Sequence, residues 1–257
     1  MSTVPEELDH VVTHFHQHGW ARLGPLLPPA QADALAARAA AIMAGTVDGR
    51  GLFFQHDAPS GRYDDLELGR GWIGPSPAYR KIERLERDPV FRAWIEAPAL
   101  APVVRAIVGD TVSLYRAVLW TKAARQGEHA GGTELPWHQD GGAFWGVTPA
   151  PILTIWTALD DAPVQAGCVE LIPGSHHGGL ATPEGGTVPD ALIAGAGARL
   201  LVPARRGDVL LLHNLVWHRS GRNHTAAPRR ALSVCYQRGD ARCLRRKHAP
   251  RTFVPLF

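Results

Sequence analysis

The sequence predicts a mainly β fold with flanking helices. After residue 111 the chain consists of short runs rich in β-branched and aromatic residues, separated by Gly and Pro turns. Helical patterns are confined to roughly the first 110 residues, and none lies between the later strands as a doubly wound α/β fold would require. Many short strands behind a helical segment favour a double-stranded β-helix, a barrel of the jelly-roll or cupin type.

The first third of the chain shows three helical segments. Ala and Leu favour helix formation, and Gly commonly follows the last helical residue. The predicted helices are residues 6–18, ending before Gly19, residues 28–45, ending at Gly45, and residues 88–109, broken at Pro98 and Pro102, with a short strand at 19–27.

A long segment from Thr46 to Pro77 is rich in Gly, Asp and aromatic residues and has little periodicity. Compact domains rarely contain an irregular connection of this length unless the connection is functional. We therefore expect a loop that acts as a lid.

The remaining chain supplies about eight predicted strands. They lie within residues 112–120, 134–140, 151–160, 167–174, 198–213, 216–221 and 229–237. The expected organisation is one domain over residues 1–257, with a helical third at 1–110, the barrel at 111–240 and a tail at 241–257.

Composition narrows the class of protein. The 257 residues are 45% hydrophobic and 20% charged, with a net charge of +3, and no apolar run approaches the roughly 20 residues of a membrane span. Three unpaired cysteines, Cys168, Cys235 and Cys243, suit a reducing compartment, so a cytoplasmic location is expected. The basic segment 242–251 is interpreted as solvated surface. The expected partner is therefore a small-molecule substrate, and neither nucleic acid nor a membrane is expected. The expected assembly is a monomer or a homodimer.

His138 and Asp140 lie two residues apart in a predicted strand. Strand side chains alternate between faces, so these two point the same way and Gln139 points oppositely. Within a barrel, His218 on a late strand is a candidate third ligand. Two histidines and one carboxylate make the facial triad of non-haem Fe(II) oxygenases.

Three motifs together carry a resemblance. They are WHQD at 137–140, IWTALDD at 155–161 with GCVELIPGSHHGG at 167–179, and HRSGRNHTAAPRR at 218–230. With these motifs the sequence resembles the phytanoyl-CoA dioxygenase family of Fe(II)/2-oxoglutarate-dependent oxygenases. The resemblance extends over most of the chain and includes KIERLERDPVF at 81–91, expected to be rich in helix.

The resemblance implies Fe(II) as the metal, with 2-oxoglutarate and O2 as cosubstrates. The family pattern places an arginine eleven residues after the distal histidine, which is Arg229 here. A guanidinium fork suits the distal carboxylate of 2-oxoglutarate. Arg230 is the rival, and only one of two adjacent strand residues can face inward.

Further cosubstrate contacts are implied for four residues. Ser220 shares the strand face of His218 and could donate its hydroxyl group, and Trp156 matches a family tryptophan beside the pocket. Lys81 matches a lysine that contacts 2-oxoglutarate in a relative. Lys122 is an alternative cation for the same contact, and either lysine could instead be a surface charge.

The implied reaction is oxidation of an unactivated C–H bond of a small metabolite, with release of succinate and CO2. Halogenases similar to this family carry a small residue where Asp140 stands, so hydroxylation or a related oxidation is favoured. Phe144 and Trp145 are candidate substrate contacts. The alternatives are an iron-dependent cupin that does not use 2-oxoglutarate and a ligand-binding barrel without turnover, and the fold selects no particular substrate.

Other histidines and glycines are expected to have structural roles. His14, His16 and His18 are expected at a helix surface, and His176 and His177 in a loop near the barrel mouth. His213 lacks an arginine at the matching distance, and residues 185–198 lack the context of a dinucleotide site.

Overall fold

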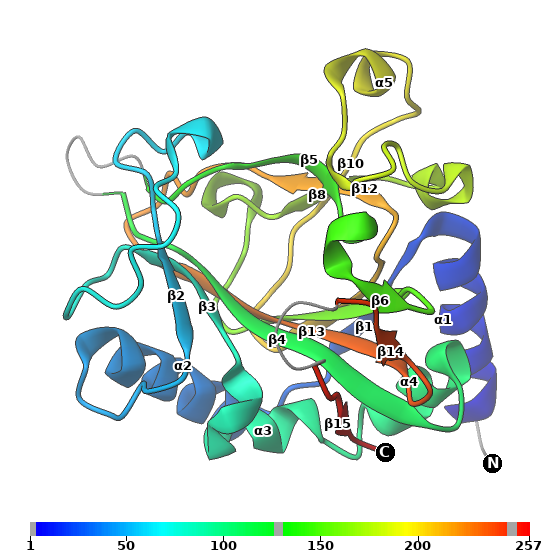
Figure 1. Cartoon of the computed structure of the whole chain (residues 1–257), viewed down its shortest axis with the longest axis horizontal. Helices are drawn as coiled ribbons and strands as arrows, with labels where there is room; N and C mark the ends of the chain where they lie inside the picture. The colour runs from blue at the N-terminus through cyan, green and yellow to red at the C-terminus, as the bar shows by residue number, and fades with distance from the viewer. Residues whose placement is uncertain (1–3, 126–130, 246–250) are drawn as a thin grey trace.

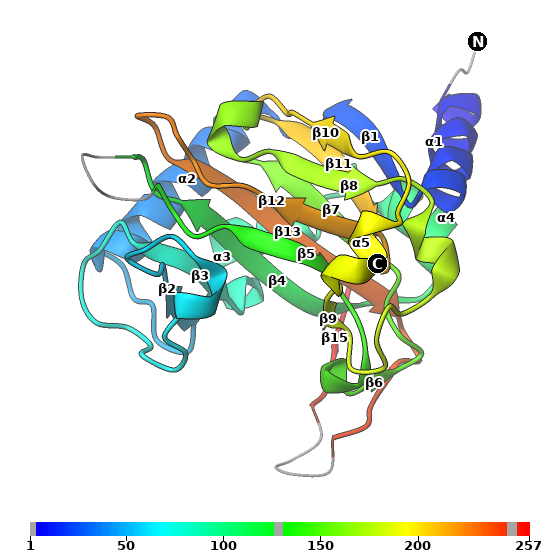
Figure 2. The same cartoon turned by 90° about the horizontal axis from the view of Figure 1, so that it is seen from above.

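The computed structural model describes residues 4–125, 131–245 and 251–257. Two antiparallel sheets lie one over the other, and helices α2, α3 and α4 cover the outer face of the larger sheet (Figures 1 and 2). The predicted class, mainly antiparallel β with flanking helices, is confirmed at this level.

The helices are α1 (Val4–His18), α2 (Pro29–Ala44), α3 (Pro89–Ile95), α4 (Ala101–Val108) and α5 (Asp190–Ala194), with 3-10 turns η1 (Tyr63–Asp65), η2 (Leu85–Arg87), η3 (Ala143–Trp145), η4 (Val164–Ala166) and η5 (Ser175–Gly178). The strands are β1 (Trp20–Pro25), β2 (Phe53–His56), β3 (Tyr79–Glu83), β4 (Val112–Lys122), β5 (Leu135–Gln139), β6 (Val147–Thr148), β7 (Leu153–Ala158), β8 (Val169–Ile172), β9 (Gly186–Thr187), β10 (Leu200–Val202), β11 (Asp208–His213), β12 (Trp217–Ser220), β13 (Arg229–Arg238), β14 (Arg242–Cys243) and β15 (Val254–Pro255).

The large sheet has the order β1-β11-β7-β13-β4-β3-β2, with β15 paired to β4. The small sheet has the order β10-β8-β12-β5-β9, and β14 pairs with β6. Strand β13 is central to the large sheet: it pairs with β4 from Arg229 opposite Lys122 to Arg238 opposite Val112, and with β7 on its other side. This pairing places β13, a late strand, between β4 and β7 from the middle of the chain.

The predicted helices form for local reasons that the structure makes visible. Gly45 ends α2 at φ 69°, a left-handed conformation that Gly adopts without strain. Asp88 caps α3 by accepting hydrogen bonds from the backbone N–H groups of Val90 at 3.0 Å and Phe91 at 3.4 Å. The break before α4 spans residues 96–100, and Pro102 lies in the first turn of α4 rather than at the break.

One expectation about the N-terminal third was wrong and one holds in part. The irregular segment 46–77 contains strand β2. The stretch 81–91, expected to be rich in helix, begins in strand β3 and continues into η2 and α3. Strand β3 pairs with both β2 and β4, and its Tyr79 and Ile82 are fully buried. Sheet pairing and burial therefore place the charge-rich residues 81–83 in a strand.

The main core lies between the large sheet and the helices. Trp94 on α3 is 1% exposed and donates its indole N–H to Thr157 Oγ1 at 3.0 Å, which joins the helix layer to β7. The other face of the sheet is turned toward the small sheet, where a second apolar cluster and a cavity with many polar lining residues lie. In the described part of the chain, no helix is long and apolar enough to cross a membrane. Within the basic segment 242–251, residues 246–250 lie outside the described residues.

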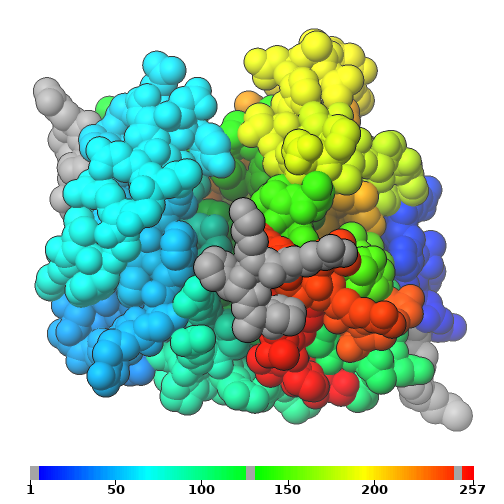
Figure 3. Space-filling view, viewed as in Figure 1, coloured from blue at the N-terminus to red at the C-terminus, as the bar shows by residue number. Residues whose placement is uncertain are grey.

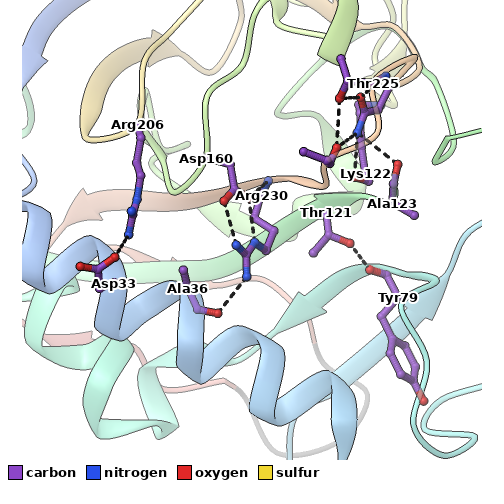
Figure 4. A network of polar contacts seen from close by, with 12 residues as sticks. Asp33, Ala36, Tyr79, Thr121, Lys122, Ala123, Asp160, Arg206, Thr225 and Arg230 are labelled. Carbon is purple, nitrogen blue, oxygen red and sulfur yellow. Dashed lines mark hydrogen bonds and ion pairs between the residues drawn. The ribbon is translucent and has the colours of Figure 1, made fainter. Parts of the chain in front are cut away.

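Arg230 joins the edge of this core to helix α2 (Figure 4). Its guanidinium donates to both carboxylate oxygens of Asp160, at 2.7 and 2.8 Å, and to the carbonyl oxygen of Ala36 at 2.9 Å. The ion pair raises the pKa of Arg230. Arg206 also reaches α2, through Asp33, but that pair is exposed.

We expect Arg230→Met to lower the free energy of unfolding by about 1.5 to 3 kcal/mol, because it leaves the half-buried Asp160 without its bidentate partner. Arg206→Met removes an exposed ion pair to the same helix and should cost less than about 1 kcal/mol. Urea unfolding followed by circular dichroism measures both values. Equal losses in the two variants would contradict this account of Arg230.

Candidate active site

Three side chains, from β12, β5 and the residue that follows β5, converge between the two sheets. One ligand atom from each of His138, Asp140 and His218 lies within 4.8 Å of the others. Strands β5 and β12 pair antiparallel with His138 directly opposite His218, and the ring centroids are 4.0 Å apart. Among the described residues, no other group of three or more His, Cys, Asp or Glu side chains has this arrangement.

Backbone carbonyl groups orient both imidazole rings. Nδ1 of His138 lies 2.9 Å from the carbonyl oxygen of Pro136, and Nδ1 of His218 lies 2.9 Å from that of Val216. An Nδ1–H that donates to a carbonyl leaves the Nε2 lone pair free to bind a metal. Burial, with a smaller effect from His218, lowers the pKa of His138 to about 3, which keeps that ring in the neutral, metal-binding form.

Asp140 is held by an arginine that the sequence analysis did not identify. Nη2 of Arg116 on β4 donates to Oδ1 of Asp140 at 2.8 Å, and Oδ2 lies 4.0 Å from Nε2 of His218. Burial would raise the pKa of Asp140, but Arg116 and the two histidines together lower it below its ordinary value. The carboxylate therefore stays charged, with one oxygen engaged and the other facing the histidines.

Gln139 points away from this cluster, as strand alternation predicted. Its amide group donates to the carbonyl oxygens of Gly179 at 2.8 Å and Leu215 at 2.7 Å, and its Oε1 accepts from Ala181 N–H at 2.7 Å. These bonds tie two neighbouring loops to β5. Gln139 thereby fixes the strand that carries two of the three candidate ligands.

The three candidate ligands line a cavity, the inner cavity, together with residues of both sheets. Four residues singled out from the sequence lie in its wall: Trp156, Ser220, Arg229 and Lys122. The remaining lining residues are Arg80, Trp120, Thr121, Thr133, Leu135, Thr154, Val169, Leu212, Arg219 and Ser233.

Arg229 is buried in the inner cavity with unused hydrogen-bonding capacity. Its Nη2 donates to the carbonyl oxygen of Gly167 at 2.8 Å, whereas its buried Nε has no hydrogen-bond partner. Gly167 adopts φ 71°, and a Cβ there would lie 2.3 Å from the carbonyl oxygen of Gly221, so only Gly fits. Burial lowers the pKa of Arg229 to about 10, which still leaves the guanidinium charged at neutral pH.

Two more cations lie close to Arg229. Lys122 is 5% exposed and donates to the carbonyl oxygen of Thr133 at 2.7 Å; burial, and then the charge of Arg229, lower its pKa well below the usual range. Arg80, which the sequence analysis missed, donates to Gln55 Oε1 at 2.8 Å and lies 5.3 Å over the Trp120 ring. Three basic side chains, Arg229, Lys122 and Arg80, therefore line the inner cavity.

Three other candidates lie outside the inner cavity, in the wall of a second, outer cleft. Lys81 pairs with Glu83 and lies 5.3 Å over the Trp120 ring. Phe144 is 54% exposed, and Trp145 is buried and stacks on Tyr115 with 4.4 Å between ring centroids. Lys122 and Lys81 therefore face different cavities.

His213, the rival to His218, lies away from the candidate ligands. Its ring is 4.7 Å from that of His176 and 5.7 Å from Phe15 on α1, and its Nδ1 accepts the backbone N–H of Leu215 at 3.0 Å. Nε2 of His176 lies 2.9 Å from the carbonyl oxygen of His16 at the end of α1. These histidines anchor the first helix.

The residues present fit an iron ion and a dicarboxylate. Two imidazole nitrogens and one carboxylate oxygen form the donor set typical of non-haem Fe(II) with open coordination positions. In the same cavity, the buried and unpartnered Nε of Arg229 offers a charge-assisted hydrogen bond to a carboxylate.

Solved structures of similar proteins share this fold. The epimerase SnoN, in complex with Fe3+, alpha ketoglutarate and nogalamycin RO, is 20% identical with a TM-score of 0.75, covering 98% of this chain and 100% of that chain. EctD from S. alaskensis, with 2-oxoglutarate and 5-hydroxyectoine, is 18% identical with a TM-score of 0.69, covering 95% and 78%.

Sequence comparisons reach the same group of proteins. Mouse phytanoyl-CoA dioxygenase domain-containing protein 1 is 30% identical over 182 residues, 65% of this chain and 60% of the relative. Human peroxisomal phytanoyl-CoA dioxygenase is 24% identical over 188 residues, 68% of this chain and 54% of the relative. The chain thus spans about 60% or less of the length of these relatives. The family model for phytanoyl-CoA dioxygenase (PhyH) matches residues 15–231. The chain belongs to the phytanoyl-CoA dioxygenase family.

Proposed function

We propose that the chain is an Fe(II)- and 2-oxoglutarate-dependent dioxygenase that oxidises a C–H bond of a small-molecule metabolite. The observation that carries the proposal is the shared inner cavity: three candidate iron ligands line it together with Arg229, a buried cation with an unpartnered donor. A metal site beside a carboxylate-binding cation is what this chemistry requires.

The comparisons support this assignment. The family match covers residues 15–231, and SnoN and EctD share the fold and hold alpha ketoglutarate or 2-oxoglutarate. We further propose that the two sheets form a double-stranded β-helix and that residues 1–257 act as one domain, because the match crosses from the helical third into the strands. A cytoplasmic location and a monomeric or homodimeric state stay predictions.

When bound, iron, 2-oxoglutarate and O2 supply the oxidising chemistry, with succinate and CO2 as products. His138, Asp140 and His218 would hold the metal in one orientation. Arg229 would bind the distal carboxylate of the cosubstrate through its free donors, and Ser220 would donate its hydroxyl group to the same molecule.

Two residues bear on the choice of reaction and cosubstrate contact. Because Asp140 occupies the position that is small in halogenases, we propose hydroxylation or a related oxidation rather than halogenation. Lys122 lies in the inner cavity and Lys81 does not, so we assign the second cationic contact to Lys122.

Succinate formation from 2-oxoglutarate, measured with and without Fe(II), tests the proposal. Iron-dependent succinate release supports it. Oxygen consumption that depends on iron but not on 2-oxoglutarate would indicate a cupin-type oxygenase, and absence of any turnover across a metabolite screen would indicate a binding protein. Either of these two results overturns the proposed function.

The candidate ligands give a first prediction. His138→Ala, Asp140→Ala and His218→Ala should each abolish succinate release and weaken Fe(II) binding, because two ligands do not hold the metal in a fixed geometry. Titration calorimetry with Fe(II) under nitrogen measures binding, and circular dichroism checks the fold. His213→Ala is the matched control, and near-wild-type turnover by the His218 variant would refute the assignment.

Arg229 gives a second prediction, with its neighbour as the control. Arg229→Lys keeps the charge but loses the planar fork, so 2-oxoglutarate should bind roughly ten- to a hundredfold more weakly, while Fe(II) binding is retained. Arg230→Lys should change 2-oxoglutarate affinity little, because Arg230 points to α2 and Asp160. The reverse order of effects would contradict the assignment of Arg229.

A third prediction concerns the irregular part of the segment Thr46–Pro77, after β2. Tyr63 lies 5.8 Å beneath the guanidinium of Arg80, which lines the inner cavity. We expect amide hydrogen exchange in residues 57–77 to slow when Fe(II) and 2-oxoglutarate bind. Strand β7, buried along its whole length, serves as the internal reference. Unchanged exchange in residues 57–77 at saturating ligand would rule out a lid.

A further inference from the structure

The outer cleft is lined by an excess of positive charge. It lies along β3, η2, β4 and η3 and is closed by residues near the C-terminus. Its cationic residues are Lys81, Arg84, Arg87, Arg92, Arg116, Arg245 and Arg251. Its acidic residues are Glu83 and Glu86. Figure 3 shows the face of the molecule where the C-terminal segment, in red, lies beside η3, in green.

The cleft keeps an excess of positive charge after its ion pairs are subtracted. Lys81 pairs with Glu83, Arg92 with Glu96 and Arg116 with Asp140. The other four arginines, Arg84, Arg87, Arg245 and Arg251, have no acidic partner within the residues that the structure describes. An ordinary solvated surface intersperses both signs, whereas a cleft lined by one sign concentrates the opposite ion.

Aromatic rings and carbonyl groups position two of these arginines, Arg251 and Arg245. The Arg251 guanidinium lies 5.1 Å from the Tyr115 ring and 5.2 Å from the Phe253 ring, and it donates to the carbonyl oxygen of Tyr115. Arg245 donates to the carbonyl oxygen of Phe144. Each guanidinium keeps further N–H donors, so an incoming anion would meet groups already in place.

Two contacts join the outer cleft to the inner cavity. Arg116 lines the cleft and holds Asp140, whose carboxylate lies in the wall of the inner cavity. Lys81 lines the cleft and lies 5.3 Å over Trp120, which lines the inner cavity. One arginine side chain, Arg116, therefore separates the cleft from the candidate ligand Asp140.

We infer that the substrate carries an anionic group, a phosphate or a carboxylate, and that the outer cleft binds this group. Arg245, Arg251 and Arg87 supply the charge, and the exposed ring of Phe144 offers an apolar contact for the adjoining part of the substrate. This inference rests on the proposed function, because it names the substrate class of the same active site.

Binding of two probe anions tests the inference. The iron-loaded chain, saturated with 2-oxoglutarate under nitrogen so that Arg229 is occupied, is titrated calorimetrically with pyrophosphate and, separately, with citrate. At least one should bind, and added salt should weaken the binding because the cleft cations are exposed. Pyrophosphate as the tighter probe indicates a phosphate-bearing substrate, and citrate a carboxylate-bearing one. Binding of neither overturns the inference.

Matched variants locate the bound anion. Arg245→Gln combined with Arg251→Gln should weaken the tighter probe about tenfold or more, the loss expected for charged hydrogen bonds. Arg87→Gln, whose side chain makes no ion pair among the described residues, should act in the same direction without disturbing those backbone contacts. The control, Arg199→Gln with Arg206→Gln, removes two exposed charges outside the cleft and should leave binding unchanged.

Two further measurements distinguish a failure of the substrate inference from a failure of the proposed dioxygenase function. If the control double variant weakens anion binding as much as the cleft double variant does, binding depends only on the net charge of the protein, and the inference is wrong. Succinate release by the wild-type chain is measured on the same preparation. Its absence overturns the proposed dioxygenase, whereas its presence without any anion binding overturns only the substrate class.

Discussion

The pairing of β5 with β12 is the constraint on which the candidate site depends. It sets His138 directly opposite His218 and leaves Asp140 one residue beyond the strand, on the same side. Because side chains alternate along a strand, a slip of one residue would turn a histidine away from the cluster. Gln139 supports this pairing, because its amide group donates to the carbonyl oxygen of Leu215, just before β12, and to that of Gly179. Carbonyl groups close to each histidine in the chain orient the two rings.

A second feature is the unbalanced charge of the inner cavity. Arg229, Lys122 and Arg80 lie at one end, and burial lowers the pKa of all three. Asp57 acts on both Lys122 and Arg80 and Glu134 acts on Lys122, so the positive charge is offset in part. Uncompensated buried cations are costly, and a bound dianion would offset that cost. The basic lining of the cavity therefore suits a dicarboxylate cosubstrate.

Much of the fold and part of the candidate site could be predicted from local sequence patterns. Strand periodicity located β4, β5, β7, β8 and β11 to β13, and the alternation of His138, Gln139 and Asp140 described that strand correctly. The missed features depend on distant partners. The start of the stretch 81–91 forms strand β3 because it pairs with β2 and β4 and because Ile82 packs in the main core. Arg116 and Arg80 leave no local signal, because their importance comes from Asp140 and Trp120, which lie far along the chain.

Arg116 joins the two cavities physically. Its guanidinium lies 4.6 Å over the Trp145 ring, in the wall of the outer cleft, while its Nη2 holds Asp140 in the inner cavity. With one carboxylate oxygen engaged by Arg116, Asp140 is left to offer its other oxygen to a metal, which suits a single-oxygen ligand and open coordination positions. The same guanidinium lines the cleft where we place the anionic group, with its charge paired to Asp140. A substitution at Arg116 would therefore alter both the metal ligand and the cleft, whereas Arg245 and Arg251 belong to the cleft alone and report on substrate charge separately from metal geometry.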